Sequence, residues 1–425
     1  MEQLAMTSRR KYLRTVGGVA AAGTLTGCTL PGSGGGEDTV RFGAVNPLSG
    51  AAGFFGQLIS DLQTKWKQRV NENGGLEVAG EQRQVEILEY DSETSNEGVR
   101  SGIENAVNVD NVDMVLSVFR TGGSLVAAPI LNENEVPGIT HGFTPRINEP
   151  GNYLLRWTSS TLMHAVPYLQ WISNNDQINR VGYLVEEGEF GDDALRSVDW
   201  WFRQSNHDGD YVQLGRFPRS QQDFSSFVSQ AANAYQNDRI DAVIIDTWAT
   251  PLQLFLEQQG SRGLNGMMPV ISGVVGGDWT PNIGELGSAM ANIYQAQVYA
   301  RPEWANNEAI RQTLPDGFEQ RTKALDDLNL NNLHPVNNLF YSELISVEQA
   351  FSQAESLNGP DLQSAFIDNT FNTLVGPLDI NNQGQGAIRA TLSKFSVRDG
   401  DPYVSEVPYS SRIPPITSIP PEADI

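Results

Sequence analysis

Short apolar runs alternate with longer amphipathic stretches over most of this chain. The first block predicts strands at residues 39–46, 84–91 and 113–118, separated by helices at residues 56–73 and 95–109. Ser95 has the short polar side chain that is typical of a helix N-cap. Strands that alternate with helices in this order favour a parallel α/β sheet. We therefore expect a β–α–β–α–β unit after residue 38.

The same alternation starts again near residue 160. It predicts strands at residues 180–185, 211–215, 241–246 and 269–272, with helices at residues 192–206, 224–236 and 252–259. Two successive blocks of this kind predict an α/β fold with two doubly wound, Rossmann-like lobes. A chain of 425 residues also exceeds what one hydrophobic core usually fills, which favours two lobes with a cleft between them. In such sheets, ligands bind at the carboxyl ends of the strands.

The last quarter of the chain has a more mixed pattern. Residues 306–332 are polar, and residues 338–357 have the spacing of a long helix. After Val407 the sequence is rich in proline and has no periodicity, so we expect it to lie over the surface or to be loose.

The first 38 residues have the order of an export signal. Arg9 and Arg10 precede about ten apolar residues, too few to cross a bilayer, which needs roughly 20. The Arg-Arg pair resembles the twin-arginine export motif, and the four residues Leu25-Thr-Gly-Cys28 resemble a lipoprotein cleavage box. This resemblance implies a signal peptide at residues 1–27 and a lipid on Cys28, the only cysteine of the chain.

A Gly-rich segment at residues 28–38 has the composition of a flexible tether. We expect it to hold the protein, lipid-anchored, on the extracellular face of the cell membrane. The alternative is that Arg9 and Arg10 flank an ordinary helix and that Cys28 is a buried thiol, but the tether would then serve no core.

The chain is strongly acidic, with 28 Lys and Arg residues against 51 Asp and Glu residues and a formal net charge of −23. Such a protein repels phosphate backbones, which argues against a nucleic-acid partner. Its carboxylates are dispersed, as in extracellular proteins of salt-loving archaea, where they stay hydrated and screened in concentrated salt. The alternative is an acidic secreted protein without salt adaptation.

Sequence motifs of catalysis are missing. The chain has no GxSxG, GxxxxGK[ST] or HExxH motif, and its four histidines are scattered. The acidic run at residues 186–189 is best explained as a solvated loop. We therefore expect no enzymatic activity, no metal site and no cofactor.

A series of short motifs resembles the solute-binding proteins of the branched-chain amino acid (Leu/Ile/Val) type. The first is Val45-Asn-Pro-Leu-Ser-Gly50, followed by Phe54-Phe-Gly56. Further motifs keep the family's order: Asn73-Gly-Gly75, Tyr90-Asp91, Pro129-Ile-Leu131, Val136-Pro-Gly-Ile-Thr140, Leu155-Arg156, Glu189-Phe-Gly-Asp192, Phe224-Ser225, Asp241-Ala-Val243 and Val375-Gly-Pro-Leu-Asp379. The resemblance implies a type I periplasmic-binding-protein fold, with two lobes joined by three crossovers. It also implies a monomer that delivers a small solute to an ABC permease.

The family's organisation divides this chain into five parts. They are a signal peptide at 1–27, a tether at 28–38, a first lobe at 39–158 and 300–374, a second lobe at 159–299 and 375–410, and a Pro-rich tail at 411–425. The resemblance puts the second crossover near residues 292–300 and the third at residues 375–377.

Three loops at the carboxyl ends of first-lobe strands are expected to form one wall of the solute site. They are residues 49–55, 119–124 and 141–144. Gly122 and Gly123 open a helix, so their loop offers free N–H groups to a carboxylate or another polar head. The alternative is that the two glycines only make a tight turn.

The family resemblance assigns specific contacts to these loops. It implies ligand contacts from Thr121 or Ser124, from Gly122 and Gly123, and from Gly142, Phe143 and Thr144. Arg120 either adds a positive charge to this site or points to solvent.

Aromatic side chains are expected on both walls of the cleft. Phe55 belongs to the first lobe, and Phe190 and Trp248 stand where the family has aromatic residues in the second lobe. Aromatic walls on both lobes bury apolar solute surface only when the cleft shuts, which couples binding to closure.

One departure from the family concerns the ammonium group of an amino acid ligand. Amino acid binders of this type have an acidic residue where this chain has Val274 and Val275. Burying an ammonium group against valine is costly. Either Asp278, Asp246 or Glu187 replaces the missing acid, or the solute has no ammonium group, as in an aromatic or branched acid or an amide.

The sequence thus predicts an extracellular, lipid-anchored protein that captures a small carboxylate or amino-acid-like solute between two lobes and delivers it to an ABC importer. The alternative is a binding protein that presents its ligand to a membrane chemoreceptor, because both roles use the same closed lobes.

Overall fold

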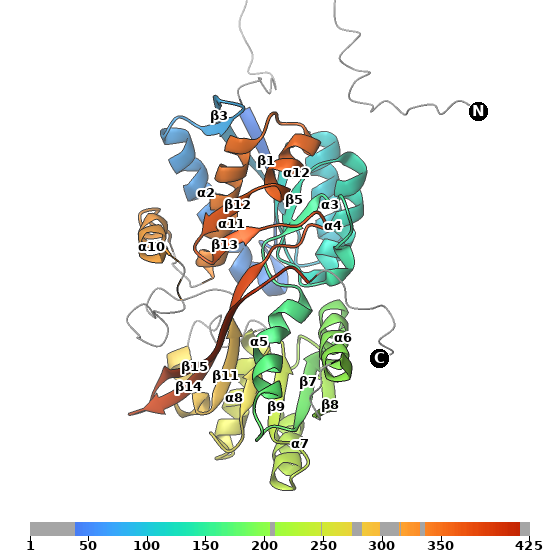
Figure 1. Cartoon of the computed structure of the whole chain (residues 1–425), viewed down its shortest axis with the longest axis vertical. Coiled ribbons are helices and arrows are strands. Elements are labelled where there is room, and N and C mark those ends of the chain that lie inside the picture. Colours follow the sequence, from blue (N-terminus) through green and yellow to red (C-terminus); the bar gives the residue numbers. More distant parts are fainter. Residues whose placement is uncertain are drawn as a thin grey trace, which may run out of the picture. The chain divides into compact units, whose positions relative to one another are not determined.

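A computed structural model describes residues 39–204, 209–247, 249–273, 283–297, 314, 316–331 and 336–416. Residues Asp38–Ile425 form one compact unit. Two large sheets, each flanked by helices, dominate it (Figure 1).

The first sheet has the strand order β2-β3-β1-β4-β5-β6. Its strands are β1 (Thr39–Asn46), β2 (Leu76–Val78), β3 (Glu81–Asp91), β4 (Met114–Val118), β5 (Gly138–Thr140) and β6 (Leu154–Arg156). All neighbours are parallel except β2, which forms an antiparallel pair with β3. The predicted strand at 39–46 is confirmed at both ends by β1.

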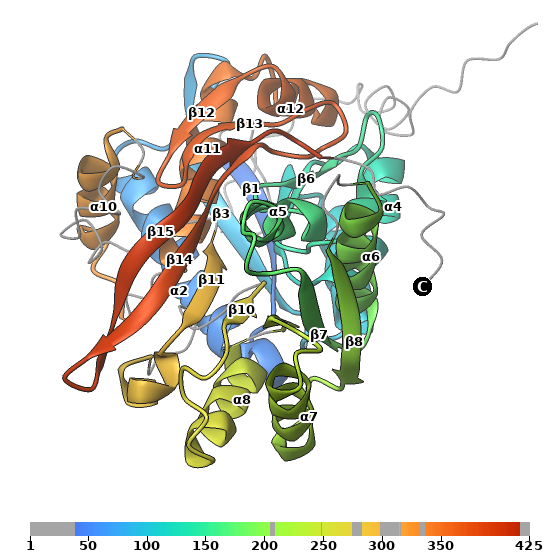
Figure 2. The ribbon, with the colours of Figure 1, turned by 60° about the horizontal axis from the view of Figure 1, so that its bottom comes forward.

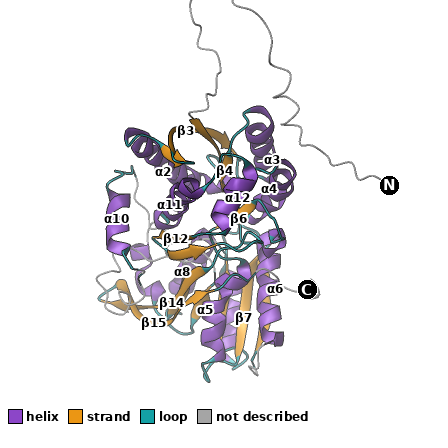
Figure 3. Cartoon of the chain, turned by 45° about the horizontal axis from the view of Figure 1, so that its top comes forward, coloured by secondary structure: helices purple, strands orange, loops and turns teal. Residues whose placement is uncertain are grey.

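Helices cover both faces of this sheet. One face packs against α2 (Gly53–Glu72) and α11 (Asn337–Gln353), and the other against α3 (Asn96–Glu104) and α4 (Thr121–Asn134) (Figure 3). The predicted N-cap is confirmed, because the Ser95 hydroxyl accepts a hydrogen bond from the N–H of Gly98. Shorter segments are η1 (Gly50–Ala52), η2 (Asn105–Val109), η3 (Pro145–Ile147), α10 (Phe318–Asp326) and α12 (Gly359–Ile367).

The second sheet has the order β15-β14-β11-β10-β9-β7-β8. Its strands are β7 (Arg180–Glu186), β8 (Asp210–Phe217), β9 (Ala242–Asp246), β10 (Val270–Ser272), β11 (Ile293–Gln297), β14 (Ile388–Arg398) and β15 (Asp401–Ile413). The strands β8, β7, β9, β10 and β11 are parallel neighbours in this order. The strands β14 and β15 add an antiparallel hairpin at the edge (Figure 2).

This sheet is also covered on both faces. Alternate strand residues face α5 (Thr161–Ser173) and α6 (Glu189–Gln204), and the others face α7 (Ser225–Gln236), α8 (Ala249–Ser261) and η5 (Ile283–Met290). Each sheet is therefore doubly wound, as the alternation of strands and helices predicted.

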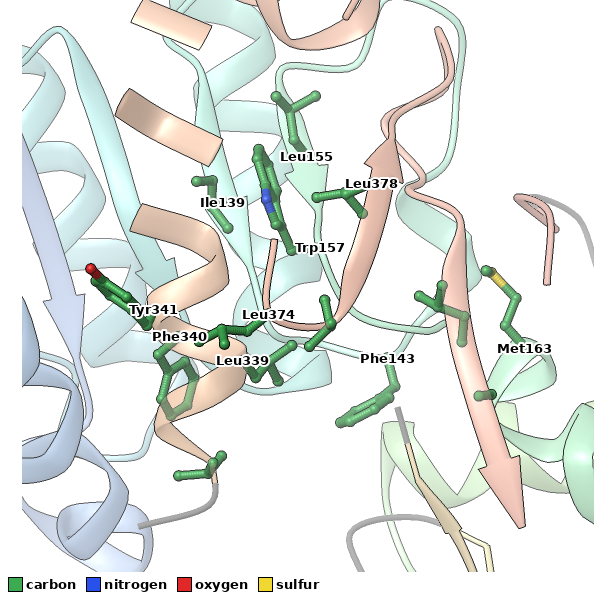
Figure 4. Close-up of a cluster of buried hydrophobic side chains, with 14 of the residues drawn as sticks. Ile139, Phe143, Leu155, Trp157, Met163, Leu339, Phe340, Tyr341, Leu374 and Leu378 are labelled. Carbon is green, nitrogen blue, oxygen red and sulfur yellow. The ribbon is translucent and has the colours of Figure 1, made fainter. Parts of the chain in front are cut away.

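The chain passes from one sheet to the other more than once. It leaves the first sheet after β6 and enters α5 of the second lobe. Later it passes again from the first lobe to the second, from α12 through the hairpin of β12 (Thr370–Thr373) and β13 (Gly376–Asp379) into β14 of the second sheet. Trp157, just after β6, lies among Ile139, Leu155 and Leu378 of the largest core cluster (Figure 4).

Three expectations about the C-terminal part are wrong. Residues 375–377 do not cross between sheets, because they belong to the turn and first residues of the β12–β13 hairpin. The predicted helix at 338–357 ends at Gln353, where Ala354 takes an extended backbone. The irregular tail expected after Val407 is still strand β15 as far as Ile413, since it has a β14 neighbour to pair with that local periodicity does not reveal.

Candidate functional site

The two first-lobe loops that follow β4 and β5 are held together by buried hydroxyl groups. The Oγ1 atom of Thr140 lies 2.6 Å from the Oγ of Ser124 and accepts a 2.9 Å hydrogen bond from the N–H of Gly142. Ser124 also donates to the carbonyl of Arg120 at 2.9 Å. The Ser124 hydroxyl is therefore engaged inside the protein, which leaves Thr121 as the better candidate of the two for a solute contact.

Thr121 begins helix α4 and has an available hydroxyl proton. Its Oγ1 accepts a long hydrogen bond, 3.4 Å, from the N–H of Phe143, and no acceptor for its own proton occurs in the described part of the chain. Gly122 and Gly123 follow in the first turn, where helical N–H groups lack intrahelical acceptors. This end of α4 therefore presents several donors at one point, as the sequence predicted.

Gly122 packs closely against the side chain of Asn96. A Cβ atom at this position would lie 2.5 Å from Oδ1 of Asn96, so a larger residue would displace the Asn96 amide. The Asn96 amide in turn donates to the carboxylate of Glu189 at 3.4 Å. Asn96 thus lies beside the first turn of α4 and links it to the first turn of α6 in the second lobe.

Two of the predicted aromatic residues meet across the lobes. The ring of Phe143 lies 6.0 Å from that of Phe190 and 5.7 Å from that of His164, both in T-shaped geometry. Phe55 is half-buried and stacks on Phe119 with ring centroids 6.3 Å apart. The structure brings Phe143 and Phe190 together.

Thr144 lies beside the ion pair of Arg146 and Asp193. Its Oγ1 accepts from the N–H of Arg146 at 3.2 Å and from Nε of the same residue at 3.3 Å. Asp193 is 1% exposed, and Arg146 Nε lies 3.1 Å from its Oδ1. Burial raises the pKa of Asp193, while Thr144 and Arg146 oppose that rise.

The Arg146–Asp193 pair was not predicted from the sequence. Its members stand 47 positions apart, and Asp193 lies in an amphipathic helix where an acidic residue usually faces water. No local pattern distinguishes a buried partner from a solvated one. The only signal was the neighbouring pair Asp192-Asp193 at the start of the helix.

Arg120 turns toward the second lobe. Its guanidinium donates to the carbonyl of Thr94, and its pKa is lowered by burial and by the nearby guanidinium of Arg219, while Glu189 and Glu186 raise it. Its backbone, with φ 72° and ψ 152°, has a conformation that only glycine adopts readily. A glycine at this position would relieve the backbone strain, but it would also remove the charged side chain.

A chain of buried polar side chains lies beneath the first-lobe loops. The Asn46 amide donates to Gln63 at 2.9 Å, and the Gln63 amide donates to Ser117 at 2.9 Å. The Ser117 hydroxyl donates to Glu343 at 3.3 Å, and the other carboxylate oxygen of Glu343 lies 2.6 Å from Nε2 of His141. This first-edge network joins the carboxyl ends of β1, β4 and β5 to helices α2 and α11.

The second-lobe sheet ends in two buried acids. Glu186 accepts from Arg219 at 2.7 Å and from the hydroxyl of Thr247 at 3.2 Å. Asp246 accepts from the hydroxyl groups of Tyr183 at 2.5 Å and Tyr168 at 3.2 Å. The predicted stand-ins for the missing acid therefore include one carboxylate, Asp246, that lies inside the protein.

Asp246 has an unusual environment for a carboxylate. It is 1% exposed, and burial raises its pKa to about 6 although both tyrosine hydroxyls lower it. Its Oδ1 atom has no hydrogen-bond partner among the residues that the structure describes. A Cβ on Gly273 would fall 1.4 Å from that oxygen, so the glycine makes room for the carboxylate.

Several predicted residues lie outside the described residues. They are the lipid-anchor residue Cys28, the aromatic Trp248, the two valines Val274 and Val275, and Asp278. Among the described residues, no group of three His, Cys, Asp or Glu side chains is arranged to hold a metal ion. Within the same ranges, no helix combines the length and apolar character needed to cross a membrane.

Comparison with known proteins gives one family and one fold. Residues 39–400 match the sequence model of the family described as periplasmic binding protein. A solute-binding protein of an ABC transporter from Rhodopseudomonas palustris, solved with 3,4-dihydroxybenzoic acid, is 19% identical and has a TM-score of 0.69, over 89% of this chain and 98% of its own. A branched-chain amino acid binding protein from Streptococcus pneumoniae, solved with isoleucine, is 17% identical with a TM-score of 0.68, over 89% and 100%. An ABC transporter substrate-binding protein from Sphaerobacter thermophilus is 19% identical with a TM-score of 0.71, over 89% and 98%.

Proposed function

Because the chain belongs to the periplasmic binding protein family, we propose that it captures a small carboxylate or amino-acid-like solute between its two lobes and delivers it to an ABC importer. The family and its solved neighbours are solute-binding proteins of ABC transporters and not enzymes, with the two-lobed type I fold. The identity of the solute and of the importer belongs to the proposal.

The donors at the start of α4 carry this proposal. The Thr121 hydroxyl and the N–H groups of Gly122 and Gly123 converge at the positive end of a 14-residue helix. A carboxylate accepts such donors through two oxygens, and bonds of this kind are among the stronger ones in proteins. A solute with a carboxylate at one end fits this wall.

Groups of both lobes indicate what the other end of the solute carries. Phe143 of the first lobe and Phe190 of the second supply apolar rings, while second-lobe strand ends supply the acceptors Glu186 and Asp246. A flat or branched apolar body with a carboxylate agrees with this division. The ligands named for the similar structures, 3,4-dihydroxybenzoic acid and isoleucine, share that carboxylate and support the proposed class.

The test is a binding screen on the unit from Asp38 onward in molar salt, by calorimetry and thermal shift. The panel contains amino acids, aromatic and branched carboxylates, and amides. Binding of carboxylates, and loss of at least 10-fold in affinity in Thr121→Val, is expected because a hydrogen bond to a charged group is lost. Thr370→Val makes the same change at an exposed strand position and should leave affinity unchanged.

A protein that binds only solutes without a carboxylate, or a Thr121→Val variant with unchanged affinity, would contradict this reading of the site. Binding confined to zwitterionic amino acids would instead direct attention to Asp246 as a partner of the ammonium group.

The proposal includes the anchor. Twin-arginine export, cleavage before Cys28 and a lipid on its thiol would hold the protein at the extracellular face, where it meets a permease. Replacing Cys28 by serine removes the thiol and should shift the protein from the membrane fraction to the medium. A Cys28→Ser protein that stays with the membrane would rule the anchor out.

A further inference from the structure

The guanidinium of Arg156 is completely buried and bonds four acceptors. Its Nε donates to the carbonyl of Gly142 at 2.9 Å, and its Nη2 donates to the carbonyl of Thr144. Its Nη1 donates to the side chains of Asn148 at 3.0 Å and Gln385 at 2.6 Å. The guanidinium of Arg156 therefore holds the loop Gly142–Thr144, here called the solute loop, which follows β5. It also holds Gln385, which lies 229 positions further along the chain.

Gln385 is also completely buried and uses its amide fully. While its oxygen accepts from Arg156, its Nε2 donates to the carbonyls of Thr158 at 3.0 Å and Gly386 at 2.8 Å. Backbone hydrogen bonds run beside them, from Arg156 N to Gly384 O at 2.7 Å and from Gly386 N to Arg156 O at 3.0 Å. Two segments that connect the sheets, one after β6 and one before β14, are thus joined side by side.

The charge of Arg156 is not offset by a bonded carboxylate in the described part of the chain. Burial lowers its pKa to about 9, and only Asp193, acting through space, opposes that change. Taking a guanidinium out of water is costly when its partners are neutral carbonyl and amide groups. A neutral side chain would fill the space at a lower cost, so the rigid fork of donors is the property that this position uses.

We propose that Arg156 and Gln385 are positioning residues that tie the solute loop Gly142–Thr144 to the two connecting segments between the lobes. This inference rests on the proposed function. Segments that link two lobes change their twist when the lobes move, as in hinge closure around a ligand. A planar guanidinium bonded to both carries that change to the carbonyls of Gly142 and Thr144. In return, a solute that fixes the loop favours one geometry of the connecting segments.

Gln385→Met tests this link because it keeps the length of the side chain and removes both its acceptor and its donor. Gln383→Met is the matched control, since Gln383 lies two positions away and its side chain has no bond among the described residues. Arg156→Lys keeps the charge but loses the fork. All variants are made in the unit from Asp38 onward, which is compact by itself.

Hydrogen exchange of the solute-free protein is the first readout. The N–H groups of Gly142 and Phe143 are bonded to Thr140 and Thr121, so they report on the loop. We expect Gln385→Met and Arg156→Lys to speed exchange at least 10-fold in a peptide covering the loop, with no change in helix α7. Unchanged loop exchange in both variants, or equal acceleration in α7, would overturn the proposal in favour of a local or global structural role.

Solute binding is the second readout, with isoleucine and 3,4-dihydroxybenzoate as probes. For a probe that binds the unsubstituted protein, Gln385→Met should weaken binding at least 10-fold and shrink the probe-induced rise in melting temperature, and Gln383→Met should do neither. Equal probe-induced rises in all variants would contradict the link. If no solute of the wider panel binds the unsubstituted protein, the proposed function fails, whereas the exchange result still decides whether Arg156 and Gln385 position the loop.

Discussion

The carboxyl edges of the two sheets are built on different electrostatic principles. Beneath the first edge, buried side chains form the first-edge network, which ends in the close pair of Glu343 and His141. At the second edge, Glu186 is paired with Arg219 and Thr247, whereas the carboxylate of Asp246 accepts only from tyrosine hydroxyls among the described residues. The first edge spreads its polar groups over several hydrogen bonds, while the second concentrates a charge.

Because of this difference, we expect the stability of the two edges to respond differently to the removal of a side chain and to a change in pH. A network in which each link has a donor and an acceptor loses stability when any member is removed, because the remaining partners stay buried and unpaired. A lone buried carboxylate instead makes stability depend on its protonation. We therefore expect the first edge to be sensitive to truncation and the second edge to be sensitive to pH.

The largest effect is expected from Glu343→Ala. Glu343 is 1% exposed and accepts from Ser117 and His141, so its removal leaves two buried donors without an acceptor. Each unsatisfied buried group costs about 1–3 kcal/mol, and we expect the free energy of unfolding to fall by about 4 kcal/mol. Urea unfolding of the solute-free protein measures this loss.

Glu348→Ala on the same helix is the matched control. Glu348 also accepts from two donors, Trp66 and Arg69, but it is half-buried, so water can replace its carboxylate. Its removal should cost less than half as much. Equal losses in the two variants would mean that burial does not distinguish the first-edge network from an ordinary helix contact.

Asp246→Asn sharpens the comparison through pH. The pKa of Asp246 rises from 3.8 to about 6 in the folded protein, so the folded form binds the proton more tightly than the unfolded chain does. Its contribution to stability is present below pH 4 and is lost as the pH rises through 6. The variant has no such loss, so its stability relative to the unsubstituted protein should improve by up to about 3 kcal/mol between pH 4 and pH 8.

Other titrating groups cancel in this difference. Burial lowers the pKa of His164 to about 3, so its contribution to stability is lost as the pH falls below 6.5, in both proteins alike. A difference that does not change with pH for Asp246→Asn would mean that Asp246 is as well solvated as a surface acid.

The fold was predictable where its signals are local. Apolar runs and amphipathic stretches gave β1, β7 and the helices between strands, because each such element carries its own periodicity. A strand was expected before the loop at residues 141–144, where β5 lies. The bounds of β5, the strand β6 and the extension of β15 to Ile413 were not predicted, since these strands have no clear periodicity of their own and form through pairing with a neighbour. The hairpin turn at residues 375–377 was misread for the same reason.

Only the part of the site that is indicated by a short motif or by the start of a helix was predictable. The pair Gly122-Gly123 indicated a helix N-terminus with free donors, and α4 confirms that start. The roles of Arg156 and Asp193 were not predictable, because their partners are 229 and 47 positions away and neither residue stands in a pattern that indicates burial. Charged residues are normally expected at the surface, so a buried one becomes visible only in three dimensions.

The smallest expected effect tests the second edge by truncation. Thr247 is 1% exposed and donates to Oε2 of Glu186, whose other oxygen is held by Arg219. Thr247→Val keeps the shape of the side chain and removes one bond, but the charge of Glu186 remains paired. We therefore expect a loss of only about 1 kcal/mol in urea unfolding, against no change in Thr370→Val. A loss as large as that of Glu343→Ala would show that the second edge is as interdependent as the first, and the contrast between a shared network and a concentrated charge would fall.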